Sequence, residues 1–158
     1  FPQGAPFPGG RLRMLDRITC WIPDGGPKGL GYLRATRRVA PDEWFFKAHF
    51  HQDPVAPGSL GLESFLQLLR FMAAERWGNS EDARFETVAT HERHEWIYRG
   101  QVIPADREVT VEAVVTAVDE SRRLVRADGY LSVDGRVIYG MKDFTLRDVR
   151  RSRLMLSD

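Results

Sequence analysis

The pattern of residues 59–77 predicts one helix with apolar side chains around most of its circumference. The apolar positions are Leu60, Leu62, Phe65, Leu66, Leu68, Leu69, Phe71 and Met72. Ser59, Glu63, Gln67 and Arg70 interrupt them, and their spacing of four, four and three places them in one narrow stripe. A helix that is apolar nearly all round has to be buried, so the rest of the chain must cover it.

The segments that cover this helix are predicted to be strands. Apolar and polar residues alternate from position 109 to 117, which is typical of a half-buried strand. Further strands are expected at residues 12–22, 30–39, 84–98, 124–133 and 136–146, with a short helical turn opening at residues 41–43. Asp134-Gly135 predicts a tight hairpin between the last two strands. The prediction is an α+β hotdog fold, in which an antiparallel sheet wraps around one long central helix.

Both ends of the chain have the composition of solvated segments. Residues 1–10 contain three Pro and three Gly and predict a linker-like segment, and residues 150–158 predict a basic tail. Residues 11–149 are expected to form a single domain. The linker-like start and the lack of an initiator Met suggest a piece of a longer polypeptide, although trimming would give the same start.

Charge and cysteine content exclude several classes of partner. The net charge of +1 provides no field that would attract nucleic acid or an anionic membrane. No stretch approaches the roughly 18 apolar residues of a membrane span, and the start lacks the pattern of a signal peptide. Cys20, the single cysteine, cannot form an internal disulfide. We expect a cytoplasmic protein that binds neither nucleic acid nor membrane.

Residues 53–58 restrict the backbone just before the predicted helix, because they include Pro54, Pro57 and Gly58. Gly58 stands at or near the helix start, where unpaired amides and the helix dipole favour negative charge. Its N–H is therefore a candidate oxyanion donor. Since every helix has such an end, this feature alone is more typical of ordinary structure than of catalysis.

Two histidines precede this loop, at positions 49 and 51. His49 follows the bulky residues Trp44-Phe45-Phe46, and an unperturbed imidazole pKa of about 6.5 suits proton abstraction near neutrality. A histidine among aromatic side chains is more often a packed residue than a base. The spacing alone also leaves His51 open as the base.

Glu63 lies on a helix that is otherwise apolar, so its carboxyl group must be hydrogen-bonded, paired or protonated. A protonated carboxyl group is a candidate acid. Gln67, one turn later on the same stripe, could hold its orientation. The alternative is that the stripe simply faces water and carries no function.

The segment His91-Glu92-Arg93-His94-Glu95 superficially resembles a zinc motif but lacks its spacing. On the predicted strand the two histidines would point to opposite faces, so they would not share a metal ion. The chain also has no glycine-rich phosphate loop and no Gly-x-Ser-x-Gly elbow. We therefore expect no metal and no cofactor.

Several motifs together resemble the bacterial β-hydroxydecanoyl-acyl carrier protein dehydratase/isomerase family. They include Trp44-Phe45-Phe46-Lys47-Ala48-His49-Phe50, Asp53-Pro54-Val55-Ala56-Pro57-Gly58 and Leu60-Gly61-Leu62-Glu63, with further likeness at residues 14–18, 29–32, 98–104 and 133–139. The resemblance runs in order from Arg11 to Arg147. The motif sequences are most similar to those of the dehydratase domains of polyunsaturated fatty acid or polyketide synthases, which would explain the linker-like start.

The resemblance implies a homodimer or a pair of hotdog units, with the substrate tunnel at their interface. By matched position, His49 is the catalytic histidine of one unit, Glu63 the acid of the other, and Gly58 the oxyanion amide. Val55 would offer its carbonyl to His49 and so fix the tautomer. Gln67 would support the acid.

The implied activity is dehydration of a β-hydroxyacyl thioester to a trans-2-enoyl thioester in fatty acid, polyunsaturated fatty acid or polyketide synthesis. The acyl chain would arrive on the phosphopantetheine arm of an acyl carrier protein. The acidic surface of this carrier could meet arginines such as Arg37-Arg38 or Arg122-Arg123, although charged runs are usually just solvated.

Glu63 stands where the dehydratase/isomerases carry Asp, whereas related dehydration-only enzymes carry Glu. Isomerisation of the double bond therefore stays open, because one extra methylene moves the carboxyl group by roughly 1.5 Å. Ser59 replaces the usual Cys, and we assign it no role. Two alternatives to a dehydratase are a hotdog acyl thioesterase, with a carboxylate that activates water, and a non-catalytic dehydratase-like module that binds acyl carrier. The presence of both His49 and Glu63 favours the dehydratase.

Overall fold

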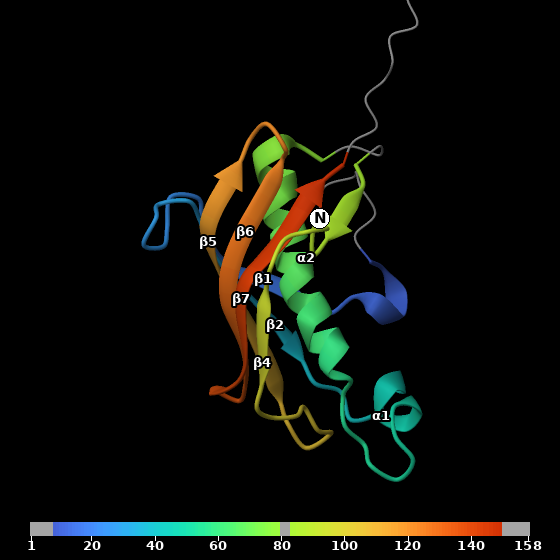
Figure 1. Ribbon diagram of the computed structural model, residues 1–158. Coiled ribbons are helices and arrows are strands. Elements are labelled where there is room, and N and C mark those ends of the chain that lie inside the picture. The colour runs from blue at the N-terminus through green and yellow to red at the C-terminus, as the bar shows by residue number, and fades with distance from the viewer. Residues whose placement is uncertain (1–7, 80–82, 150–158) are drawn as a thin grey trace, which may run out of the picture.

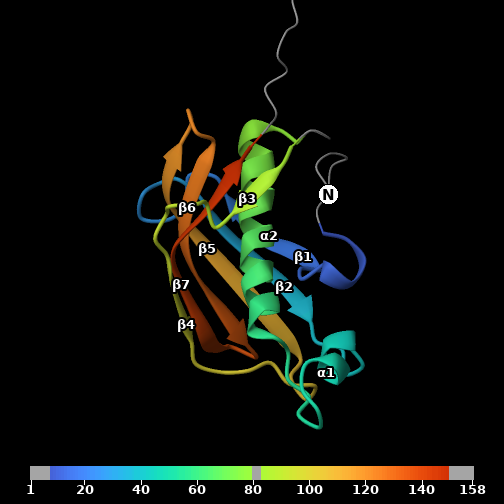
Figure 2. The same cartoon turned by 45° about the vertical axis from the view of Figure 1, so that its right-hand side comes forward.

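The computed structural model describes residues 8–79 and 83–149, which form a curved antiparallel sheet around one long helix (Figures 1 and 2). The predicted linker-like segment and basic tail lie mostly or wholly outside these residues. The seven strands are β1 (Arg17–Ile22), β2 (Tyr32–Arg38), β3 (Phe85–Thr87), β4 (Glu95–Tyr98), β5 (Glu108–Asp119), β6 (Leu124–Val133) and β7 (Arg136–Asp148). Their order is β1-β2-β5-β6-β7-β3, and β4 also pairs with β7.

The central helix is α2 (Gly58–Trp77), which begins one residue before the predicted start and ends at the predicted residue. Six consecutive residues, 64–69, are buried, so the helix is covered on all sides at its middle. Phe65, Leu68 and Leu69 are fully inaccessible, and they pack with β-strand residues such as Val111 and Phe144. The predicted hotdog fold is confirmed.

Two short helical segments precede α2. A 3-10 turn, η1, spans Gly10–Leu12, and α1 spans Trp44–Ala48, beginning just after the predicted helical turn. The views in Figures 1 and 2 place α1 at the end of the molecule where α2 begins. The chain therefore brings the segment that contains His49 to the amino end of the central helix.

The prediction of one strand over residues 84–98 is wrong. This segment forms β3 and β4, which both pair with β7 and are separated by a turn. The break follows from contacts with a distant strand: the N–H of Val88 donates to the Thr145 carbonyl at 2.9 Å, and that of Ala89 donates to the Thr145 hydroxyl at 2.9 Å. His91 lies in this turn with a φ of 68°, so neither it nor His94 is on a strand as expected.

The first strand is shorter than predicted, because it starts at Arg17 rather than near residue 12. Met14 and Leu15 are nevertheless buried, at 3% and 2% exposure. The backbone N–H of Met14 donates to Oε1 of Gln67 at 3.0 Å, which ties this segment to α2 instead of to a neighbouring strand. No helix within the described ranges is long and apolar enough to span a membrane.

Candidate active site at the amino end of the central helix

His49 is held in place by the short helix before it and the loop after it. Phe45 and Phe46 anchor α1 in the core, and the His49 N–H closes this helix by donating to the Phe45 carbonyl at 3.0 Å. The chain then turns through Gln52, which has a φ of 57°, and returns to the buried Val55. As a result, the Val55 carbonyl oxygen lies 3.1 Å from Nδ1 of His49.

This contact selects the tautomer of the neutral His49 ring. A carbonyl oxygen only accepts, so a hydrogen bond here requires the proton on Nδ1 and leaves Nε2 as the basic nitrogen of the neutral ring. Nε2 has no hydrogen-bond partner within the described ranges. The ring is half-buried and packs against Phe50 at 3.9 Å between centroids. His51, by contrast, is exposed and makes no hydrogen bond there.

The first turn of α2 leaves its opening amide unpaired. Pro57 is the N-cap residue and provides no side-chain cap, and the Leu60 N–H donates to its carbonyl at 3.0 Å. The Gly58 N–H has no acceptor among residues 8–79 and 83–149. A Cβ at Gly58 would lie 2.8 Å from Cε2 of Tyr98, so a larger residue here would have to displace the Tyr98 ring.

Glu63 is paired rather than solvated. Its Oε1 accepts hydrogen bonds from Nε2 of Gln67 at 3.0 Å and Nη1 of Arg70 at 2.8 Å. The Glu63 and Arg70 side chains are only 23% and 15% exposed. The alternative that the polar stripe simply faces water therefore does not describe it. Oε2 of Glu63 has no hydrogen-bond partner among the described residues.

Gln67 connects this carboxyl group to the start of the chain. It is 3% exposed and donates from Nε2 to the Leu12 carbonyl at 2.7 Å as well as to Glu63. Its Oε1 accepts from Met14, so every polar atom of the amide is used. Arg70 was not predicted as a partner of Glu63, although its place on the same stripe two turns later was the signal that could have identified it.

Within one chain, the described structure holds two separate groups of predicted site residues. The first is His49 with Val55 and the start of α2, and the second is Glu63 with Gln67. No hydrogen bond joins His49 to Glu63 in the described residues. The predicted roles of these residues remain predictions.

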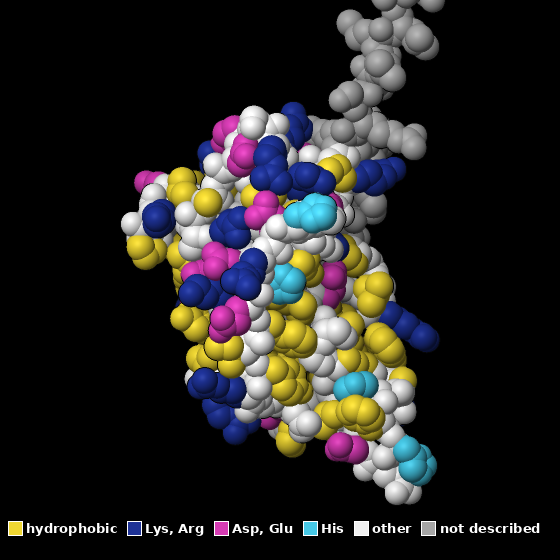
Figure 3. Space-filling view, in the orientation of Figure 1, with side chains coloured by type: hydrophobic (Ala, Val, Ile, Leu, Met, Phe, Trp, Pro, Cys, Tyr) yellow, Lys and Arg dark blue, Asp and Glu magenta, His cyan; other side chains and the backbone are white. Residues whose placement is uncertain are grey.

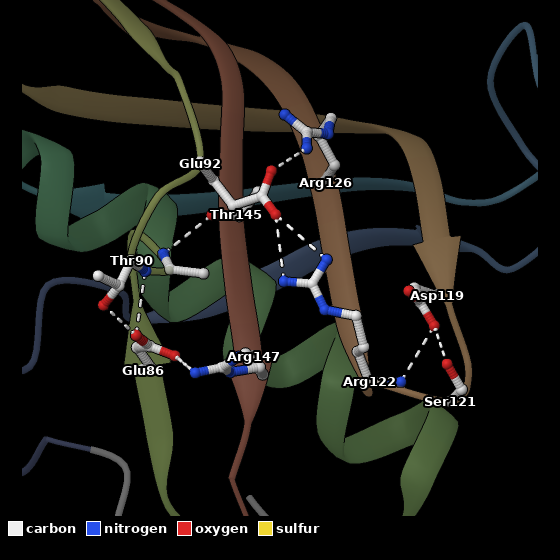
Figure 4. A network of polar contacts seen from close by, with 10 residues as sticks. Glu86, Thr90, Glu92, Asp119, Ser121, Arg122, Arg126, Thr145 and Arg147 are labelled. Atoms are coloured by element: carbon white, nitrogen blue, oxygen red, sulfur yellow. Dashed lines mark hydrogen bonds and ion pairs between the residues drawn. The ribbon is translucent and has the colours of Figure 1, made fainter.

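Most of the arginines suggested for carrier binding already form ion pairs with acidic side chains of the same chain. Arg37 pairs with Glu43 and lies over the Phe45 ring at 5.6 Å. Arg122 pairs with Glu92 at 3.2 Å in the network of Figure 4. Arg123 pairs with Asp148 at 3.4 Å, whereas Arg38 is exposed and has no ion pair in the described ranges.

An apolar cavity lies between the first turns of α2 and the elements packed around them. Its lining includes Phe45, Ala56, Leu60, Val102 and Leu131, from α1, the loop before α2, α2, the segment after β4, and β6. The Ala56 N–H donates to the Val102 carbonyl at 2.9 Å and joins two of these walls. The cavity therefore offers apolar surface next to the amino end of the helix.

The FabA-like domain matches residues 7–142, which is most of the chain. The protein belongs to the FabA-like family. The match covers His49, Val55, Gly58, Glu63 and Gln67.

Solved structures share the fold at low sequence identity. A dehydratase heterocomplex, ApeI:P from Xenorhabdus doucetiae, is similar with a TM-score of 0.62 and 12% identity, covering 94% of this chain and 89% of that one. A hypothetical thioesterase with coenzyme A from Streptococcus pneumoniae has a TM-score of 0.56 at 14% identity, covering 86% and 88%. A phenylacetic acid degradation protein, PaaI from Thermus thermophilus, has a TM-score of 0.55 at 11% identity, covering 84% of this chain and 92% of that one. The fold is therefore shared by proteins named for different activities, and it does not decide the reaction.

Proposed function

We propose that this protein dehydrates β-hydroxyacyl thioesters carried on an acyl carrier protein, giving trans-2-enoyl thioesters. The observation that carries the proposal is the contact between Nδ1 of His49 and the Val55 carbonyl, in a chain of the FabA-like family. It leaves Nε2 as a base beside the amino end of α2. A half-buried imidazole with one fixed nitrogen is suited to remove a proton near neutral pH.

In the proposed reaction, Nε2 of His49 takes the proton from the α-carbon of the substrate. The electron pair of that C–H bond forms the double bond, and charge on the thioester oxygen is stabilised by the Gly58 N–H. In the substrate complex Glu63 carries a proton and gives it to the β-hydroxyl group, which leaves as water, and Arg70 stabilises the carboxylate that remains. Both donors to Glu63 use Oε1, so the proton of the acid form would lie on Oε2.

We propose that His49 and Glu63 meet across a homodimer interface. Support comes from β4, an edge strand that pairs only with β7 among the described strands. Its Trp96, Ile97 and Tyr98 are 37%, 39% and 44% exposed, and Figure 3 shows hydrophobic side chains gathered over the face formed by β4 and α2. An open apolar strand edge is a favourable place for a second copy to pair.

The acyl chain is proposed to enter from the interface and place its apolar part near α2. The cavity lined by Phe45, Leu60 and Leu131 provides additional apolar surface there. Among the arginines suggested for the carrier, Arg38 is the one whose side chain is exposed and has no ion pair within residues 8–79 and 83–149. The lone Cys20 fits the reducing cytoplasm as the setting for this reaction.

Thioester hydrolysis is the second candidate. A thioesterase would use an ionised carboxylate to activate water, and the ion pair of Glu63 with Arg70 suits that ionised state. This reaction gives no role to the fixed His49 tautomer, which is why we rank dehydration first. The two reactions give different products from one substrate.

The test is to incubate the protein with a β-hydroxyacyl thioester of a phosphopantetheinylated carrier and to follow the acyl mass. Dehydration lowers the mass of the carrier-bound chain by one water, and His49→Ala should abolish that loss. Free hydroxy acid as the main product would replace the proposal with a thioesterase. A dimeric protein that binds the carrier but neither dehydrates nor hydrolyses the thioester would indicate a non-catalytic module. Chromatography of the enoyl product separates 2-enoyl from 3-enoyl chains and tests for isomerisation.

A further inference from the structure

Three aromatic side chains form a wall beside the amino end of α2. This aromatic wall consists of Trp96 and Tyr98 from β4 and Tyr139 from β7. The ring centroids of Tyr98 and Tyr139 are 4.9 Å apart, and Trp96 packs edge-on against both, at 5.8 and 5.7 Å. Tyr98 and Tyr139 are direct cross-strand partners, so the sheet register fixes their contact.

The aromatic wall touches the backbone of the first turn of α2. A Cβ at Gly61 would lie 2.3 Å from Cε2 of Tyr139, and a Cβ at Gly58 would lie 2.8 Å from Cε2 of Tyr98. Cε2 is bonded to the carbon that carries the phenol oxygen. The side edge of the Tyr98 ring, Cε2 and Cδ2, therefore lies against the helical turn that presents the unpaired Gly58 N–H, and the hydroxyl group is one carbon beyond Cε2.

The two tyrosines of the wall differ in what their hydroxyl groups can do. Tyr139 is 1% exposed, and burial raises the pKa of its phenol well above the ordinary value, with a further increase from its electrostatic and hydrogen-bond interaction with Tyr98. Tyr98 is 44% exposed, and Tyr139 is its one polar partner among residues 8–79 and 83–149. A hydrogen bond donated by Tyr139 to the Tyr98 oxygen would leave the Tyr98 proton available to a ligand.

We propose that the Tyr98 hydroxyl is a second oxyanion donor, which acts with the Gly58 N–H on the thioester oxygen of the substrate. This inference rests on the proposed dehydratase function. As His49 removes the α-proton, negative charge grows on the thioester oxygen, and two donors stabilise it better than one. Tyr98 keeps its proton throughout, so it adds no bond-making step. Packing against Gly58 and Tyr139 needs only the ring, which phenylalanine would supply equally well.

The experiment compares Tyr98→Phe with Tyr130→Phe in the full chain, using the carrier-bound β-hydroxyacyl thioester. Tyr130 is a matched control because it lies on the same sheet, in β6, and is 54% exposed. Tyr98→Phe should lower kcat by about 10²-fold. It should change KM by less than about threefold, because the interaction strengthens only as charge develops.

The outcomes separate this inference from the proposed function. Tyr130→Phe should keep the wild-type rate. The melting temperature of Tyr98→Phe should fall by a few degrees, because the buried Tyr139 hydroxyl loses its partner. Rates are therefore compared at a temperature at which every variant is fully folded. An active wild type with an unchanged kcat for Tyr98→Phe would overturn the role of Tyr98 alone. An effect on KM without an effect on kcat would also overturn it, since that result indicates binding without charge stabilisation. A wild type without dehydration would overturn the function as well.

Discussion

The two ends of α2 use their polar groups in opposite ways. At the amino end, the Gly58 N–H is unpaired in the described residues and the helix has no side-chain cap. At the carboxyl end, Nε of Arg76 and Nε1 of Trp77 both donate to the carboxylate of Glu120 at 2.6 Å. The same contrast holds between His49, with a free Nε2, and Glu120, with both oxygens engaged.

This difference supports the proposal that the amino end of α2 binds a ligand, whereas the carboxyl end is anchored by its ion pair and hydrogen bond with Glu120. Both ends are attached to the same sheet, so a loss of fold would affect them together. Substitutions that separate activity from stability are therefore the way to test the contrast. Changes to the polar groups near the amino end should alter turnover, whereas changes to those near the carboxyl end should alter stability alone.

The largest effect is expected for His49→Ala. It removes the proposed base, so dehydration should fall by about 10³-fold in a kcat/KM measurement. Stability to urea should be nearly unchanged, because the ring is only half-buried. His51→Ala is the control and should keep the wild-type rate, since His51 is exposed. Loss of activity in His51→Ala with a fully active His49→Ala would reverse the assignment.

Glu63→Gln should lower kcat by about 10²-fold, because the amide keeps the shape of the side chain but cannot donate the acidic proton. Gln67 and Arg70 can still donate to its carbonyl oxygen, so the fold should persist. Glu75→Gln, on the exposed carboxyl-terminal part of the same helix, is the matched control and should turn over normally. Equal rates for both variants would remove Glu63 from the chemistry.

Gly61→Ala tests the contact between the amino end and the aromatic wall. Alanine in place of glycine would ordinarily stabilise a helix interior by up to about 1 kcal/mol. Here the new Cβ would lie 2.3 Å from the buried Tyr139 ring, so we expect a net loss of about 1–3 kcal/mol in the free energy of unfolding. Urea denaturation measures it, with Ser59→Ala in the preceding exposed position as control. A stabilised Gly61→Ala protein would mean that the aromatic wall leaves room for a Cβ at this position of the helix.

The smallest effect concerns pH and the carboxyl end. Hydrogen bonds from Trp77 and then Arg76 lower the pKa of Glu120 below its ordinary value of 4.5. A carboxyl group with a lowered folded pKa stabilises the protein above its unfolded pKa, and the stabilisation is lost as the pH falls through the folded pKa. Glu120→Gln should therefore be slightly less stable than the wild type at pH 7 and equal to it in acid, with dehydration unchanged at pH 7. A stability difference that does not shrink on acidification would contradict this reading.

Elements with a strong local pattern were predictable from the sequence. The apolar surface of α2 specified a buried helix and its ends to within one residue, and β6 has its predicted bounds, ending at the Asp134-Gly135 turn. His49 and Val55 were predicted to contact each other from family resemblance, and their atoms lie 3.1 Å apart.

Features that depend on distant residues were not predictable. The break between β3 and β4 is set by hydrogen bonds to Thr145, which is more than 50 positions away. Met14 and Leu15 have the apolar character of a strand, but Gln67 captures the Met14 backbone. The pairing of Arg70 with Glu63 is an intermediate case, because the shared stripe places the two residues on one face of α2 but leaves their side-chain directions open.

The most direct test of the central claim mixes two inactive variants, His49→Ala and Glu63→Gln, and measures dehydration after subunit exchange. If each site takes His49 from one subunit and Glu63 from the other, half of the dimers regain one intact site. Activity should then rise from the background of either variant to about a quarter of the wild-type value. Mixed dimers that form, as seen by native mass spectrometry, and yet stay at background would contradict a site shared between subunits.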